Sequence, residues 1–217
     1  LYPTARSAAP SSGAHVPVLF DEVMDGLRPI AGGRYIDGTL GAGGHAAGIL
    51  ERAAPDGRLL GFDRDPEAVA FATRRLAPFD DRAVLVAGSF GDMADVAPGL
   101  GFDAVDGILL DLGLSSRQLA DSERGFSFLQ EGPLDMRFDA RTGETAADLV
   151  NNLSAEGLAD IFFRYGEEQQ SRRIARLVVA HRPIETTTAL ASLIAGNFRR
   201  TPSGRHPATK VFPALRI

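Results

Sequence analysis

Residues 35–45 read Tyr-Ile-Asp-Gly-Thr-Leu-Gly-Ala-Gly-Gly-His, and this stretch decides the fold class. A strand pattern ends in the acid Asp37, a glycine-rich turn follows, and a helical pattern begins at Gly44. A strand, a glycine turn and a helix in this order are typical of nucleotide-binding α/β proteins, in which glycine lets backbone N–H groups approach a ligand closely. The stretch therefore predicts a nucleotide or nucleoside site after the first strand.

The first half of the chain alternates strand and helix patterns. We expect strands at residues 35–40, 58–63, 83–87 and 105–110, with helices at 44–52 and 67–76. Apolar strands separated by helices indicate a parallel sheet covered on both faces, and right-handed crossovers bring the carboxyl ends of its strands to one edge. The residues expected at or just beyond this edge are Asp37, Asp63, Phe90 and Asp111.

The glycine turn is compatible with more than one ligand. Gly41-x-Gly43-x-x-Ala46 superficially matches the dinucleotide fingerprint, which favours a nicotinamide-dependent oxidoreductase. Asp37 stands against that interpretation, because a carboxylate beside the glycines would repel a pyrophosphate but would suit the positive S-adenosylmethionine. Asp63 would accept hydrogen bonds from ribose hydroxyls, or is simply a solvated acid at a strand end. A tight turn without any ligand is a further alternative.

The alternation stops after Asp111. Residues 112–139 look loop-like, and helices are expected at 145–152, 154–165, 167–181 and 187–198, with Thr145 and Ser154 as N-caps. This pattern predicts a helical subdomain inserted after the fourth strand. Because four strands alone leave a sheet edge to be paired or covered, we expect later strands of the sheet to be missing from this chain.

The predicted domain organisation has four parts. They are a disordered N-terminal segment without a signal peptide (1–14), the N-terminal part of a Rossmann-like domain (15–114), an inserted helical subdomain for substrate recognition (115–205) and a segment returning toward the first domain (206–217).

Composition narrows the class of protein. The chain has 217 residues, 44% of them hydrophobic, no cysteine and no apolar run long enough to span a membrane, which excludes thiolate chemistry and fits a cytoplasmic protein. Residues 1–160 hold 13 arginines against 25 acidic residues, whereas residues 161–217 hold nine arginines and one lysine against three acidic residues. The basic part suggests contact with a polyanion, and the alternative is a solvated helix face.

Longer motifs carry a resemblance to a known family. They read DGILLDLGLSSRQL at 106–119, DSERGFSF at 121–128, GPLDMR at 132–137, HVPVLFDEV at 15–23 and HPATKVF at 206–212. Over residues 15–217 the chain closely resembles the bacterial ribosomal RNA small-subunit methyltransferase H family (RsmH, formerly MraW). Pro213 departs from it, since the family usually has Gln there, and the family continues beyond the last residue of this chain.

The resemblance implies a class I S-adenosylmethionine-dependent methyltransferase fold interrupted by a helical subdomain. It implies an enzyme that methylates N4 of cytosine 1402 in 16S ribosomal RNA, with the small ribosomal subunit as partner. No membrane partner and no metal site are expected, since the four histidines are scattered, and a homodimer is left open. A non-catalytic RNA-binding or assembly protein that keeps the fold is the remaining alternative.

The residues and the resemblance together give the candidate site. Cofactor contacts are expected at Asp37, Gly41, Gly43, Gly44, His45, Asp63, Phe90, Asp111 and Gln118. Asp111 is the first candidate to accept a hydrogen bond from the cytosine amino group, although it could equally bind only the cofactor, and Asp135 and Ser115 are lesser candidates.

RNA contacts are expected mainly in the second half of the chain. They are Arg124, Phe126, Phe128, Arg137, Arg172, Arg173, Arg176, His206 and Lys210. Phe126 and Phe128 would stack on the target base, or pack under the helical subdomain instead. Arg124 and Arg137 would contact phosphate, or pair with neighbouring aspartates.

Overall fold

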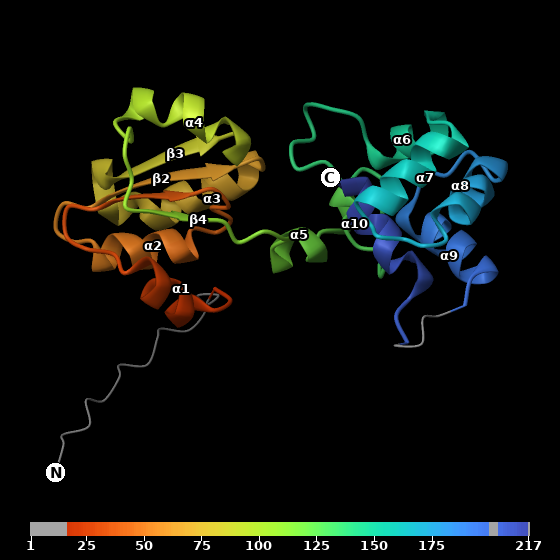
Figure 1. Cartoon of the computed structure of the whole chain (residues 1–217), viewed down its shortest axis with the longest axis horizontal. Helices are drawn as coiled ribbons and strands as arrows, with labels where there is room; N and C mark the ends of the chain where they lie inside the picture. Colours follow the sequence, from red (N-terminus) through yellow and green to blue (C-terminus); the bar gives the residue numbers. More distant parts are fainter. Residues whose placement is uncertain (1–16, 200–203, 217) are drawn as a thin grey trace, which may run out of the picture. The chain divides into compact units, whose positions relative to one another are not determined.

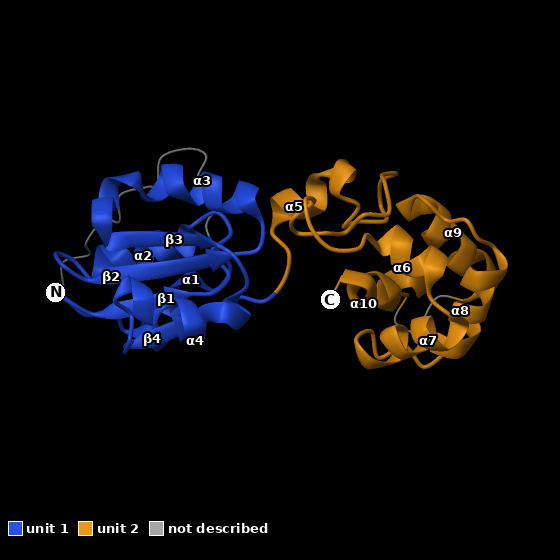
Figure 2. Cartoon of the chain, turned by 90° about the horizontal axis from the view of Figure 1, so that it is seen from above, with its two compact units in different colours: residues 1–112 blue, residues 113–217 orange. Residues whose placement is uncertain are grey.

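The computed structural model describes residues 17–199 and 204–216 and divides the chain into two compact units (Figure 2). Unit 1 comprises residues 1–112 and unit 2 comprises residues 113–217. The N-terminal segment expected at 1–14 lies outside the described residues. None of the helices in the described ranges has the length and apolar character needed to cross a membrane.

Unit 1 contains a four-stranded parallel sheet of order β3-β2-β1-β4 (Figure 1 and Figure 2). Its strands are β1 (Arg34–Asp37), β2 (Arg58–Asp63), β3 (Ala83–Ala87) and β4 (Gly107–Leu109). Asp37 is paired in register with Gly61 and Leu109, so neighbouring strands end at nearly the same level. This order is the beginning of the Rossmann arrangement, whose direction reverses between β1 and β4, and it confirms the predicted fold class.

Helices cover both faces of this sheet. They are α1 (Phe20–Leu27), α2 (Gly44–Arg52), α3 (Pro66–Leu76) and α4 (Met93–Val96). Consecutive residues of β1 enter different cores: Tyr35 packs with residues of α1, α2 and α3, and Ile36 packs with Met93 and Val96 of α4. Side chains of a strand alternate between faces, so one short strand supplies both layers. The sequence patterns did not predict α1.

The β4 edge is less covered than expected. The strand was predicted over 105–110 but spans three residues, and Ile108 and Leu110 are 48% and 43% exposed. Helices cover both faces of the sheet as expected, while the side chains of Ile108 and Leu110 stay partly exposed at this edge of the described chain. That later strands pair with β4 stays a prediction.

Unit 2 is helical. Its helices are α5 (Ser116–Ala120), α6 (Ala146–Asn152), α7 (Ala155–Arg164), α8 (Ser171–Ala180), α9 (Thr187–Asn197) and α10 (Val211–Arg216). The predicted caps are confirmed: the Thr145 hydroxyl accepts a hydrogen bond from the Asp148 N–H at 3.0 Å, and the Ser154 hydroxyl accepts one from the Gly157 N–H at 3.1 Å. Unit 2 has its own core, in which Leu158, Ile174 and other residues are almost fully buried.

Three segments of unit 2 differ from the sequence patterns. The helix α5 lies in a stretch expected to be a loop, and α8 begins at Ser171 rather than 167, because Glu167 adopts a left-handed φ of 50° that ends the preceding turn. Residues 207–216 pack against α7 and α9 within unit 2. Their proposed return toward the first domain stays a prediction.

Candidate cofactor and catalytic site

One loop after β1 joins three aspartates at the carboxyl edge of the sheet. The Thr39 N–H donates to Asp37 Oδ1 at 3.0 Å, and the Gly41 N–H donates to Asp63 Oδ2 at 2.8 Å. The Asp111 N–H in turn donates to Thr39 Oγ1 at 2.7 Å. Residues from the ends of β1 and β2 and from just beyond β4 therefore meet around a single turn, as the topology predicts.

Asp37 is the buried member of this group, at 1% exposure. Burial, and to a smaller extent the negative charges of Asp63 and Asp111, raise the pKa of its carboxyl from 3.8 to about 7. The hydrogen bond from the Thr39 N–H opposes this rise in pKa without cancelling it. A positive ligand beside the three carboxylates would relieve their mutual repulsion, whereas a pyrophosphate would add to it. The electrostatics of the loop therefore favour a cationic ligand.

Asp63, at the carboxyl edge of the sheet, also fixes the glycine loop through hydrogen bonds. Its Oδ1 accepts from the Asp65 N–H at 2.9 Å, in addition to the bond from Gly41 to Oδ2. Asp65 in turn accepts from the Glu67 N–H at 3.0 Å and so caps α3. A carboxylate accepts up to about four hydrogen bonds, so fixing the turn is compatible with the predicted contact to ribose hydroxyls.

The glycines of the loop serve different purposes. Gly41 has a left-handed φ of 49°, and Gly43 (φ 71°) is the residue before α2. A Cβ at Gly44 would lie 2.4 Å from Pro17 Cγ, so this glycine admits the segment before α1. A cofactor contact at each of the three positions stays a prediction.

Gly38 lies where two neighbouring segments converge, and the sequence patterns did not single it out. A Cβ there would lie 2.5 Å from Leu110 Cδ2 and 2.9 Å from Phe90 Cβ. Phe90, half-buried after β3, therefore stands beside the loop that Asp111 also reaches. This placement is compatible with the predicted wall of an adenine pocket, although that role stays a prediction.

The side chain of His45, at the start of α2, contacts α1 and the residues just before it. Its ring is buried and stacks on Phe20 with 6.1 Å between ring centroids, and Nε2 lies 3.2 Å from Val18 O. These contacts hold α1 against α2. They supply a packing role beside the predicted cofactor contact.

The remaining cofactor and catalytic candidates belong to unit 2, where each has a local structural role. Ser115 and Gln118 form a capping box at α5, with bonds of 3.2 Å and 3.0 Å between the side chain of each and the N–H of the other. Asp135 accepts from Arg137 Nε at 2.8 Å and from Nη2 at 2.7 Å. These bonds to Arg137 lower the pKa of Asp135, which makes it a weak base.

The aromatic and basic candidates near residue 126 are largely engaged inside unit 2. Phe126 is 3% exposed in the core, as the packing alternative expects, and the Arg124 guanidinium lies 5.2 Å from its ring centroid. Arg124 also donates to Phe138 O at 2.8 Å. Phe128 packs 4.9 Å from the His206 ring. Arg137 pairs with Asp135, which is the alternative to a phosphate contact.

The arginines of α8, unlike the candidates near residue 126, are exposed. Ser171, Ile174, Ala175 and Val178 are buried, whereas Arg172, Arg173 and Arg176 are exposed on the same helix. Arg173 and Arg176 line a groove of about 300 Å³ together with Leu177, Asn197 and Phe198, none of which is acidic. The Arg173 guanidinium lies 5.2 Å from the Phe198 ring centroid, which holds it at the groove.

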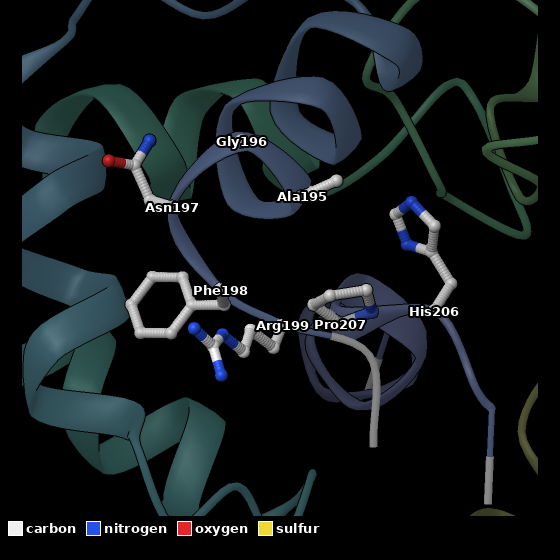
Figure 3. A pocket seen from close by; sticks show the side chains of 7 residues that line it. All are labelled: Ala195, Gly196, Asn197, Phe198, Arg199, His206 and Pro207. Carbon is white, nitrogen blue, oxygen red and sulfur yellow. The ribbon is translucent and has the colours of Figure 1, made fainter. Parts of the chain in front are cut away.

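A second hollow shares Asn197 and Phe198 with this groove (Figure 3). It encloses about 500 Å³ and its lining includes Arg199 and His206. His206 Nδ1 accepts from the Ala208 N–H at 3.2 Å. Lys210, another RNA candidate, donates to Glu167 O at 2.8 Å and so braces the turn before α8.

Comparison with known proteins identifies the family. The sequence profile described as the MraW methylase family matches residues 12–217. "Ribosomal RNA small subunit methyltransferase H" of Geotalea uraniireducens is 51% identical over 211 residues, covering 94% of this chain and 67% of that protein. The protein of the same name from Thermomicrobium roseum is 52% identical over 211 residues, covering 96% of this chain and 65% of its own.

This chain spans about two thirds of the length of these curated relatives. A solved structure of a SAM-dependent O-methyltransferase from Thermotoga maritima shows a weaker likeness, with a TM-score of 0.37 and 21% identity over 46% of this chain and 37% of that one. The profile match covers nearly the whole chain, so the protein belongs to the MraW methylase family.

Proposed function

We propose that the protein transfers a methyl group from S-adenosylmethionine to the amino N4 of a cytosine in 16S ribosomal RNA of the small subunit. The observation that carries this proposal is the convergence of Asp37, Asp63 and Asp111 on one glycine loop at the sheet edge. The relatives' name, ribosomal RNA small subunit methyltransferase H, supports the class of substrate. The choice of cytosine N4 rests on the sequence resemblance.

The residues of the loop fit S-adenosylmethionine. Asp37 lies beside Asp63 and Asp111, whose negative charges add to burial in raising its pKa, and this group of acids suits a ligand with positive ammonium and sulfonium groups. Asp63 would hold the ribose hydroxyls, and Phe90 would line the adenine side. When bound, the cofactor supplies an electrophilic methyl group attached to a positive sulfur.

Asp111 is the residue that we assign to the substrate amine. The lone pair of the cytosine amino group is delocalised into the ring, so an acceptor must bind one N–H and orient the nitrogen. Asp111 is exposed at the edge of the sheet, with its backbone fixed by Thr39. Asp135 is the weaker candidate, because its ion pair with Arg137 lowers its pKa.

The α8 groove is the part of unit 2 that we assign to the RNA backbone. Arg173 and Arg176 face it from one helix, and Asn197 closes it from α9. Guanidinium groups pair with phosphates in a bidentate manner, and the described residues that line the groove include no carboxylate to compete. The target base must leave its stack, or lie in an unpaired segment, to reach the methyl group.

The test of this function is a radiolabelled methyl-transfer assay on small subunits that lack the modification, followed by nucleoside mass spectrometry. We expect label in N4-methylated cytidine. Label in a different nucleoside would refute the proposed position, and absence of label from RNA would refute the proposed activity.

The Asp111→Ala variant tests the catalytic assignment. We expect turnover at saturating cofactor to fall by about 100-fold or more, as is typical for loss of a positioned acid–base group. The Asp103→Ala variant, which removes an exposed carboxylate before β4, is the control and should keep wild-type turnover. Wild-type turnover in Asp111→Ala would exclude Asp111 as the acceptor.

A further inference from the structure

The pairing of β1 with β4 continues past the last residue of β4 through a side chain. The main-chain pairing ends with the Gly38 N–H donating to Leu109 O at 2.9 Å. Two residues further along the β4 segment, the Asp111 N–H finds Thr39 Oγ1 at 2.7 Å. The hydroxyl of Thr39 thus accepts the hydrogen bond that a backbone carbonyl of β1 would accept if the strand pairing continued to Asp111.

Thr39 itself is held in place by Asp37, the last residue of β1. The Thr39 N–H donates to Asp37 Oδ1 at 3.0 Å. Asp37 is 1% exposed, so its position is set by close packing. Thr39 therefore links Asp37 to Asp111, because its backbone N–H binds the Asp37 carboxyl and its hydroxyl accepts from the Asp111 N–H.

The segment from β4 to Asp111 is less tightly packed than the end of β1. The strand is three residues long, and Ile108 and Leu110 are each more than two fifths exposed, so apolar packing restrains the segment before Asp111 only in part. Asp111 itself is exposed. Within the described chain, the hydrogen bond to Thr39 therefore has a large share in fixing the backbone that carries the Asp111 carboxylate.

We propose that Thr39 is a positioning residue that holds Asp111 in place for the substrate amine through the hydrogen bond to the Asp111 N–H. The inference rests on the proposed function insofar as it gives Asp111 a role in methyl transfer. It adds a requirement that the glycine pattern does not contain: a β-hydroxyl two residues after the acid of β1.

Two substitutions separate the hydroxyl from the shape of the side chain. Thr39→Val keeps the shape and removes the hydroxyl, and Thr39→Ser keeps the hydroxyl. We expect Thr39→Val to lower kcat about tenfold with KM for S-adenosylmethionine within about twofold of wild type, and Thr39→Ser to retain most of the wild-type kcat. Equal kcat in Thr39→Val and wild type, or equal losses in both variants, would overturn the proposal.

Hydrogen exchange of the Asp111 amide gives a readout that does not depend on activity. In the cofactor-free protein we expect this amide to exchange about tenfold faster in Thr39→Val and at nearly the wild-type rate in Thr39→Ser, with unchanged circular dichroism in both. Unchanged exchange in Thr39→Val overturns the inference whether or not RNA is methylated. If wild-type protein fails to methylate RNA while the amide responds as expected, the proposed function fails and the Thr39 contact stands.

Discussion

At the scale of single residues, Asp37 has the least ordinary environment among the carboxylates of the loop. It lies at the end of β1 with 1% exposure, and the structure surrounds it with Thr39 and two other acidic residues. The sequence pattern indicated an acid beside the glycines, but its burial depends on how the elements around the end of β1 pack together. Its raised pKa could therefore not be read from the sequence.

The raised pKa of Asp37 predicts a dependence of stability on pH. The folded protein holds this proton up to about pH 7, whereas the unfolded chain releases it near 3.8, so the stabilising contribution is present at low pH and is lost as pH rises through 7. Between pH 5 and pH 8 the loss through this residue is about 3 kcal/mol. Urea unfolding of wild type and Asp37→Asn at both pH values measures it.

The Asp37→Asn variant should lack this part of the pH dependence and be the more stable protein at pH 8. Its amide oxygen can still accept the Thr39 N–H, so the turn is preserved. Stability curves of variant and wild type that run parallel from pH 5 to pH 8 would show that Asp37 titrates as an ordinary carboxylate.

Asp63 yields a prediction about cofactor affinity. Replacing it with alanine removes the proposed ribose contact and the acceptor for the Gly41 N–H together, so we expect Kd for S-adenosylmethionine to rise about tenfold or more. The control is Asp81→Ala, which removes an exposed carboxylate just before β3, at the amino-terminal edge of the sheet. Calorimetry that finds equal affinity in Asp63→Ala and wild type would remove Asp63 from the site.

At the scale of elements, clear strand and helix patterns and N-cap residues in the sequence predicted the elements correctly. The bounds of β2, α2 and β3 agree with the sequence patterns, and Thr145 and Ser154 cap helices as their side chains predict. The pattern failed for α1, whose N-cap position is a Leu19 in left-handed conformation without a side-chain cap. Its single fully buried residue is Met24, so packing on α2 rather than local sequence fixes this helix.

Site residues from the helical unit were harder to predict than those on the sheet. Strand ends are placed together by topology, which is readable from alternation. The partners of Gln118, Asp135 and Phe126 are set by local caps, an ion pair and a core that forms only once the helices pack. Residue type alone does not separate these roles from ligand contacts.

The helix α8 carries the prediction for RNA. Replacing Arg173 and Arg176 with alanine removes two guanidinium groups from the groove, and we expect affinity for small-subunit RNA to fall about tenfold at moderate salt. The slope of log K against log salt should become shallower by about 1.4, the value for two phosphate contacts on a single strand. The control is Arg164→Ala on α7, whose arginine pairs with Asp160 at 3.5 Å. An unchanged slope in the double variant would exclude α8 from the interface.

At the scale of the whole molecule, acidic and basic side chains are distributed unevenly between the two compact units. The sheet unit gathers acidic side chains at its carboxyl edge, and the helical unit contains the segment in which basic residues outnumber acidic ones. The alternation of strands and helices and its end after Asp111 indicate a boundary at this point of the sequence, and the structure divides into its two units between residues 112 and 113. The later strands of the sheet remain a prediction, because the chain spans about two thirds of its relatives.

The most direct test is a calorimetric titration of the protein with S-adenosylmethionine and, separately, with NAD. The carboxylates around the glycine loop predict saturable binding of one S-adenosylmethionine and no measurable heat from NAD. Saturable binding of NAD without binding of S-adenosylmethionine would contradict the assignment of this edge to a cationic methyl donor.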